Sequence, residues 1–128
     1  PRAGLSLADM RRAGPRQPLL DAIETSADGQ SFNFRPEMMA EKLYHDCPAE
    51  TVEFALAHLG PQAIKPQATA LPSADVAVRR RYILCSNDQA IPPDYQATMS
   101  QGWADLRRMN ASHSPFFAQP QTLARLIQ

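Results

Sequence analysis

The sequence predicts an α/β fold in which parallel strands are flanked by helices, and three observations carry this prediction. The short apolar run Tyr82–Cys85 is closed by polar turn residues, a pattern typical of a strand buried on both faces of a parallel sheet. A helix opened by prolines is expected at residues 92–103, and residues 104–110 form a second, weaker strand candidate. A last helix is expected over residues 120–128, so strands and helices alternate as they do in parallel sheets.

The first part of the chain gives weaker signals. Residues 1–36 show little periodicity, and short helices are expected at residues 6–12 and 18–23. Residues 27–31 contain an Asp-Gly pair, which predicts a turn. In residues 31–34 phenylalanines alternate with polar side chains, which predicts a short strand.

The middle of the chain is predicted to be mainly helical. A helix is expected from Pro36 onward, and the clearest helical pattern spans residues 46–61. Its apolar stripe has the spacing i, i+3, i+4 and i+7 and consists of Val52, Ala55, Leu56 and Leu59. A Gly-Pro pair ends this helix, and residues 64–78, which contain two prolines, are expected to be an extended linker.

Composition narrows the function classes. The 128 residues fit one domain or a piece of one, and the 13 basic and 13 acidic residues leave no basic surplus for a nucleic acid or an anionic membrane. The arginines at 79–81 are interpreted as a solvated entrance to the following strand. No apolar run approaches the roughly 20 residues of a membrane span, and the first residues lack the apolar core of a signal peptide.

The cysteines and the first residue bear on the origin of the chain. Cys47 and Cys85 fit no metal spacing, and reduced thiols in the cytoplasm are the simplest interpretation, with a single disulfide as the alternative. The chain begins at Pro1, so we expect either a processed product or a segment of a larger protein.

Two ionisable residues follow the two predicted strands. Asp88 comes after the strand that ends at Cys85, and His113 comes after the candidate strand at residues 104–110. Sites in open α/β sheets form beyond the carboxyl ends of the strands, so these side chains are expected to meet. An aspartate bonded to one ring nitrogen fixes the tautomer of a histidine, and the other nitrogen is then a general base. In the alternative interpretation Asp88 only caps a turn and His113 is structural or exposed.

Other polar residues are assigned structural roles. Ser112 and Ser114 flank His113, but adjacent side chains in a tight loop point apart, so both hydroxyls are expected to bond to loop backbone. Ser86 lacks the glycines that a strained nucleophile turn requires. His58, near the end of its helix, is interpreted as structural.

Two stretches resemble a known family. "RRYILCSNDQAIPPDYQ" and "MNASHSPFFAQPQTLARLI" resemble the carboxyl-terminal part of the α/β-hydrolases, in the branch of methyl-salicylate esterases and hydroxynitrile lyases. The D-x-x-I-P loop of that branch is matched by Asp88 to Pro92. Its A-x-H loop is matched by Ala111 to His113, and "EKLYHDCPAETVEFALAHLGPQ" resembles the end of its cap. The resemblance implies a mainly helical cap over residues 1–46 and a core over residues 47–128.

The resemblance implies a serine-dependent carboxylic ester hydrolase in which Asp88 orients His113. Such enzymes run Ser, Asp, His along the chain, but the 128 residues contain no G-x-S-x-G motif. The serine is therefore expected from an amino-terminal part of the same hydrolase, which would be the partner of this chain. The implied substrate is a small apolar ester, with no cofactor and no metal. Its pocket is expected to include Phe32, Phe34, Met38 and Met39, although the same residues would also suit an ordinary cap core.

Two alternatives stay open. Hydroxynitrile lyases of this branch resemble each other in carrying a lysine directly after the histidine, and Ser114 stands at that position, which favours the esterase. Gln89 replaces a lysine that often follows the aspartate. The second alternative is a binding module that kept the fold and lost catalysis. Because Tyr82–Cys85 would expose an apolar sheet edge, we expect the chain to be ordered only beside its missing strands or in a homo-oligomer.

Overall fold

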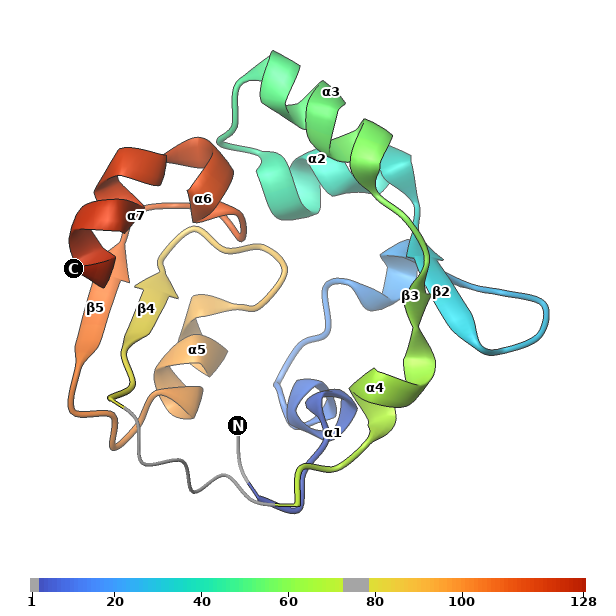
Figure 1. Cartoon of the computed structure of the whole chain (residues 1–128), viewed down its shortest axis with the longest axis horizontal. Helices are drawn as coiled ribbons and strands as arrows, with labels where there is room; N and C mark the ends of the chain where they lie inside the picture. Colours follow the sequence, from blue (N-terminus) through green and yellow to red (C-terminus); the bar gives the residue numbers. More distant parts are fainter. Residues whose placement is uncertain (1–2, 73–78) are drawn as a thin grey trace.

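The computed structural model in Figure 1 describes residues 3–72 and 79–128. The helices are α1 (Leu7–Arg12), α2 (Pro36–Tyr44), α3 (Ala49–His58), α4 (Ile64–Ala68), α5 (Pro93–Met99), α6 (Pro115–Ala118) and α7 (Pro120–Ile127), together with a 3-10 turn at Leu20–Ala22. The strands are β1 (Ile23–Thr25), β2 (Ser31–Phe34), β3 (Gln62–Ala63), β4 (Tyr82–Cys85) and β5 (Leu106–Met109).

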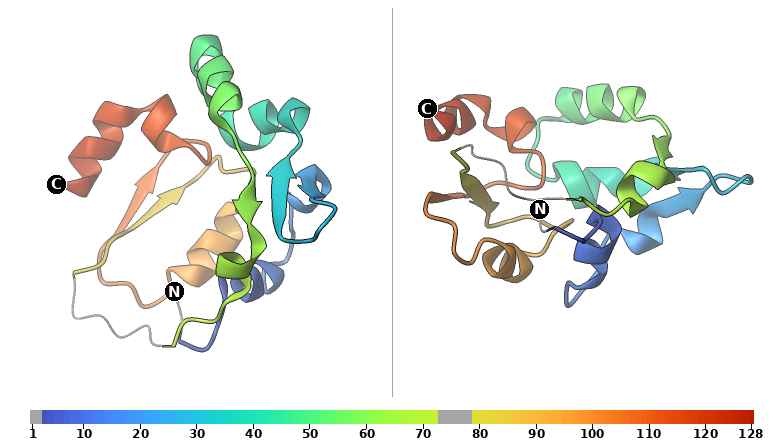
Figure 2. Two further views of the ribbon diagram at one scale, coloured as in Figure 1. Left: turned by 45° about the vertical axis from the view of Figure 1, so that its right-hand side comes forward. Right: turned by 60° about the horizontal axis from the view of Figure 1, so that its bottom comes forward.

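Strands β4 and β5 form the parallel pair that the sequence predicted. They run in register from Tyr82 opposite Leu106 to Cys85 opposite Met109. Figure 2 shows α5 on one side of this pair and α6 with α7 on the other. The end of β4 is buried, whereas three of the four residues of β5 are exposed. Within the described residues β4 pairs with β5 alone, which leaves its second edge without a strand. The predicted α/β architecture with helices flanking parallel strands is therefore confirmed.

The first half of the chain forms a small antiparallel sheet, with the predicted strand β2 at its centre. β1 pairs with one edge of β2, and the two-residue strand β3 pairs with the other. Of the expected helix at residues 18–23, only a 3-10 turn at Leu20–Ala22 forms, and Ile23 already begins β1. Pairing with β2 satisfies the backbone groups of this segment, and that tertiary contact overrides its local helical tendency.

The expected linker at residues 64–78 is wrong in its first part. Residues Ile64–Ala68 form helix α4, which contacts α1. Pro66 does not interrupt this helix, because it lies in the first turn, where a backbone N–H has no intrahelical acceptor. Residues 73–78 of the expected linker lie outside the described part of the chain.

The core of the first half lies between α2, α3 and the 3-10 turn. Ala22 and Met39 are both 0% exposed, and Leu43, Tyr44, Ala55 and Ala90 complete this buried cluster. Ala90 belongs to the loop after β4, so the cluster joins the helical half of the chain to the strand pair. Phe34 and Phe117 pack against its border.

The arginines at 79–81 are not simply a solvated strand entrance. Nε of Arg81 donates a 2.7 Å hydrogen bond to Oδ2 of Asp105, and only 17% of the Arg81 side chain is exposed. Arg79 and Arg107 also pair with the Asp105 carboxylate. The Arg80 guanidinium lies 5.6 Å from the ring centroid of Trp103. Because Asp105 precedes β5 and Arg81 precedes β4, this ion pair ties together the first ends of the two strands.

The described residues contain no helix that is long and apolar enough to cross a membrane. The division into a cap at residues 1–46 and a core at residues 47–128 stays a prediction. In the structure α3 packs on α2 and β3 pairs with β2, so elements on either side of residue 46 share contacts.

Candidate active site

The site begins with a tight loop after β4 that holds the carboxylate of Asp88. Both the backbone N–H of Ala90 and that of Ile91 donate to Oδ1 of Asp88 over 2.8 Å. An aspartate that bonds to the backbone N–H groups two and three residues ahead closes a turn on itself. Only 5% of the Asp88 side chain is exposed, so these bonds fix a buried carboxylate in one orientation.

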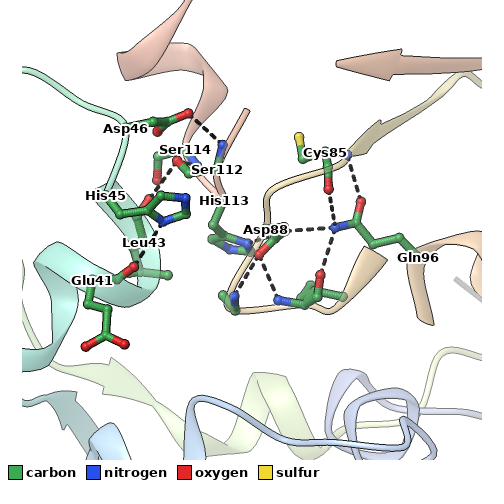
Figure 3. A network of polar contacts seen from close by, with 12 residues as sticks. Glu41, Leu43, His45, Asp46, Cys85, Asp88, Gln96, Ser112, His113 and Ser114 are labelled. Atoms are coloured by element: carbon green, nitrogen blue, oxygen red, sulfur yellow. Dashed lines mark hydrogen bonds and ion pairs between the residues drawn. The ribbon is translucent and has the colours of Figure 1, made fainter. Parts of the chain in front are cut away.

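Gln96, on α5, is the second support of Asp88. Its side-chain amide donates to Oδ2 of Asp88 over 3.0 Å and to the carbonyl of Ile91 over 2.8 Å. Its carbonyl oxygen accepts from the backbone N–H of Cys85 over 3.0 Å. Gln96 is 3% exposed, and its amide therefore joins the end of β4, the Asp88 loop and α5 into one rigid unit, drawn in Figure 3.

Asp88 and His113 meet as the sequence predicted. Nδ1 of His113 lies 2.9 Å from Oδ2 of Asp88. A carboxylate only accepts hydrogen bonds, so Nδ1 carries the ring proton in this pair. In the neutral ring Nε2 is then left with its lone pair. Asp88 accepts hydrogen bonds at both of its oxygens, so its charge is satisfied without solvent.

The His113 loop is anchored to the helical half of the chain. The backbone N–H of Ser112 donates to Oδ2 of Asp46 over 2.7 Å, and the Ser112 hydroxyl donates to the carbonyl of Leu43 over 3.2 Å. The N–H of Ser114 donates to the Ser112 hydroxyl over 3.3 Å. Figure 3 shows Asp46 and Leu43 reaching this loop from the end of α2. The expectation of a bond to backbone is confirmed for the Ser112 hydroxyl, and for the Ser114 hydroxyl it stays a prediction.

His113 also borders a cavity of about 290 Å³. Its apolar walls come from α1, the segment after α1, β2, the Asp88 loop and α5, and include Leu7, Leu19, Phe32, Phe34, Ile91 and Met99. One third of the His113 side chain, 33%, is exposed, in contrast to the buried Asp88. The histidine is therefore the member of the pair that a small molecule in the cavity can reach.

Of the four residues expected to line a substrate pocket, Phe32 and Phe34 border this cavity and Met38 and Met39 do not. Met39 is fully buried in the core cluster, and Met38 packs against that cluster. The physical reason is the helical period: α2 turns its methionines toward α3 and the 3-10 turn, whereas β2 points its phenylalanines toward the cavity.

The other nucleophilic side chains have structural surroundings. Within the described residues, no serine hydroxyl bonds to His113. The Ser86 hydroxyl lies 3.3 Å from the carbonyl of Met109. Burial raises the pKa of the Cys85 thiol to about 11, and burial also raises the pKa of Cys47, which opposes thiolate formation. Both cysteines are free thiols, and no three metal-ligating side chains come together in the described part of the chain.

Comparison with known proteins shows which proteins resemble this chain in sequence and in fold. No protein-family model matches the chain. Methylesterase 3 of Arabidopsis thaliana is 30% identical to this chain over an alignment of 130 residues. The alignment covers 92% of this chain and 49% of that protein. A pyrethroid hydrolase from Sphingobium faniae has a TM-score of 0.76 at 21% identity, over 98% of this chain and 55% of that structure. Polyneuridine aldehyde esterase has a TM-score of 0.75 at 20% identity, over 99% of this chain and 57% of that structure.

The fold is that of the carboxyl-terminal half of an α/β-hydrolase. The homologues of the chain are methylesterases and other α/β-hydrolases, as the sequence resemblance implied. The chain spans about half of the length of methylesterase 3 and less of the other curated relatives.

Sequence reasoning missed two residues of this site. Gln96 falls in an amphipathic helix, where a polar residue is expected to face solvent, and only the fold turns it toward Asp88. Asp46 lies 66 residues before Ser112 in the chain, so no local pattern links the two. The one available signal for Gln96 was its position one turn into the helix that follows the D-x-x-I-P loop.

Proposed function

We propose that this chain is the Asp-and-His part of a serine carboxylesterase whose serine lies on an amino-terminal segment of the same hydrolase. The single observation that carries the proposal is the 2.9 Å contact between Nδ1 of His113 and Oδ2 of Asp88 at the border of an apolar cavity. We call the chain together with that serine-bearing segment the assembled protein.

The proposed chemistry uses the free ring nitrogen of His113. Nε2 removes the proton of the serine hydroxyl while the serine oxygen attacks the ester carbonyl, and the carbonyl electrons move onto its oxygen. The imidazolium then gives that proton to the departing alkoxide, which leaves as an alcohol, and the acyl group stays on the serine. Water repeats the sequence with the acyl-serine and releases the acid. Asp88 keeps its hydrogen bond to Nδ1 of His113 and stabilises the imidazolium.

The open edge of β4 supports the same proposal. A strand with an unpaired edge in a two-stranded pair buries too little backbone to be stable alone. Further parallel strands beside β4 would satisfy that edge and would bring the nucleophile to the strand ends where Asp88 lies. Assembly with the missing segment is thus our proposal for the partner, and a second copy of the chain is the other occupant of the edge. Cytoplasmic location is proposed on the two free thiols.

The experiment follows hydrolysis of 4-nitrophenyl acetate by the assembled protein. The His113→Ala substitution should lower kcat by about 10⁶-fold and Asp88→Asn by about 10⁴-fold, the losses measured when the corresponding triad members are replaced in other serine hydrolases. His58→Gln is the control, because His58 bonds to the carbonyl of Phe54 and stacks on its ring, away from the pair.

The result separates the enzyme from the binding module. Hydrolysis that survives His113→Ala rejects His113 as the base. A preceding segment with another residue in place of the G-x-S-x-G serine, combined with no hydrolysis of simple esters, supports the binding module and rejects the esterase.

A further inference from the structure

Arg11 borders the cavity of His113, and its Nε has no hydrogen-bond acceptor among the described residues. It lies in the last turn of α1 and borders the same cavity as His113. Within the described residues, Nε of Arg11 is sealed from solvent and has no hydrogen-bond acceptor. Its neighbours differ: Arg12 pairs with Asp9 over 3.3 Å and Arg16 pairs with Asp94 over 3.7 Å.

A buried N–H without an acceptor is unfavourable, and for a charged group the cost is larger than for a neutral one. Arginine side chains stay charged in proteins, so loss of a proton does not relieve this cost. An oxygen that enters with a ligand would supply the acceptor once the Arg11 side chain turns its sealed Nε toward the cavity.

The charges of the residues that line the cavity indicate what kind of ligand group would supply this oxygen. Its described lining includes Arg11 and Arg16 and contains no aspartate or glutamate. Besides Tyr95 and His113, the other polar residues of the lining are the neutral Gln17, Gln62 and Gln67. A low-dielectric cavity lined by one sign of charge favours the opposite charge. An anionic group therefore suits this cavity better than a hydroxyl or an amide.

We propose that Arg11 binds a free carboxylate on the substrate, so that the enzyme acts on half-esters whose second acid group is separated from the scissile ester by an apolar spacer. This rests on the esterase function proposed above. The planar guanidinium donates two parallel hydrogen bonds to a carboxylate, a geometry that Lys does not reproduce. Phe32 and Phe34 line the cavity and contact the spacer.

The test compares two ester series of graded chain length with the assembled protein: monomethyl esters of dicarboxylic acids, and methyl esters of the matching monocarboxylic acids. The ratio of kcat/KM for acidic over neutral ester should exceed unity and should peak at one spacer length. Arg11→Met should lower this ratio about tenfold to a hundredfold, the range expected for a charge-assisted hydrogen bond. Arg11→Lys should recover part of the loss. Arg12→Met, on the same helix but outside the cavity, is the matched control.

A parent enzyme that prefers neutral esters overturns the carboxylate site, as does a ratio unchanged in Arg11→Met, and in both cases the esterase function stands. A thermal shift with the free dicarboxylate separates the site from catalysis. If the dicarboxylate stabilises the parent but not Arg11→Met, and no ester is hydrolysed, the carboxylate site is supported and the esterase function is rejected. If the dicarboxylate does not stabilise the protein and the half-esters are not preferred, the site is rejected.

Discussion

Oδ2 of Asp88 accepts hydrogen bonds from the side-chain amide of Gln96 over 3.0 Å and from Nδ1 of His113 over 2.9 Å. One carboxylate oxygen thus links α5 to the histidine loop. Because the amide also bonds to the backbone at the end of β4, it aims the carboxylate at the histidine as well as completing its hydrogen bonds. A residue that does not border the cavity thereby helps to orient His113.

The first prediction concerns this amide. Gln96→Met keeps the volume but removes the donor to Asp88 and the acceptor of the Cys85 N–H. Leaving that buried N–H unpaired should cost about 1–3 kcal/mol of unfolding free energy. We expect kcat of the assembled protein to fall about tenfold to a hundredfold, measured with a chromogenic ester. Gln121→Met, on the exposed first turn of α7, is the control and should change neither quantity.

The Gln96→Glu variant tests whether Gln96 acts by its hydrogen bond to Asp88 or only by filling space. The variant keeps the shape and the acceptor for Cys85 but places a second carboxyl beside Asp88. Neighbouring carboxylates cannot both ionise easily, so one keeps its proton to higher pH. Its activity relative to the parent should therefore rise as the pH is lowered, because the protonated form restores a donor. A ratio independent of pH would contradict a positioning role.

The second prediction concerns the anchor of the histidine loop. Asp46→Ala removes the acceptor of the Ser112 N–H, and we expect stability to fall by about 1 kcal/mol and kcat by about tenfold. Asp46→Asn keeps one accepting oxygen and should retain most of the stability and most of kcat. Glu53→Ala, an exposed acidic residue on α3, is the matched control. Equal effects of Asp46→Ala and Glu53→Ala would show that the anchor does not hold the loop.

The third prediction tests the role of the two methionines of α2. Met39→Ala removes a fully buried side chain and should cost about 2–5 kcal/mol, measured by urea unfolding of the assembled protein. Met38→Ala, at a half-buried position on the border of the cluster, should cost clearly less. If Met38→Ala is as destabilising as Met39→Ala, the packing described for α2 is wrong.

The fourth prediction is a pH dependence. The hydrogen bond from Arg81, with the charges of Arg81, Arg107 and Arg79, lowers the pKa of Asp105 below its ordinary value of 3.8. A carboxyl whose pKa is lower in the folded state stabilises fully above its unfolded pKa, and this contribution is lost as the pH falls through the folded pKa. Asp105→Asn should therefore lower the unfolding free energy near neutral pH.

The difference between Asp105→Asn and the parent should shrink as the pH drops below about 4. Urea unfolding at a series of pH values measures it. Glu53→Gln supplies the reference for removing an exposed charge without arginine partners in the described structure. If the difference in unfolding free energy does not change with pH, Asp105 does not contribute to the pH dependence of stability.

The sequence predicted the parts of the fold that depend on local patterns. Strand β4 and the helices around it are marked by an apolar run, prolines and turn residues, and Asp88 and His113 are placed by the rule that sites follow parallel strands. Strand β1 and helix α4 were missed, because β1 exists through pairing with β2, and α4 begins before a proline in its first turn. Gln96 was missed because its partner is chosen by how α5 packs.

The register of β4 and β5 sets the spacing of the proposed dyad. Cys85 lies opposite Met109; Asp88 follows three residues later (88 − 85 = 3) and His113 four residues after Met109 (113 − 109 = 4). Sliding either strand by one two-residue repeat would displace its tip by about 7 Å and carry the imidazole out of reach. The register of these two four-residue strands therefore sets the distance between Asp88 and His113. The Arg81–Asp105 ion pair holds the other ends of the strands together. If the dyad is catalytic, selection should consequently extend to an ion pair at the opposite end of the two strands.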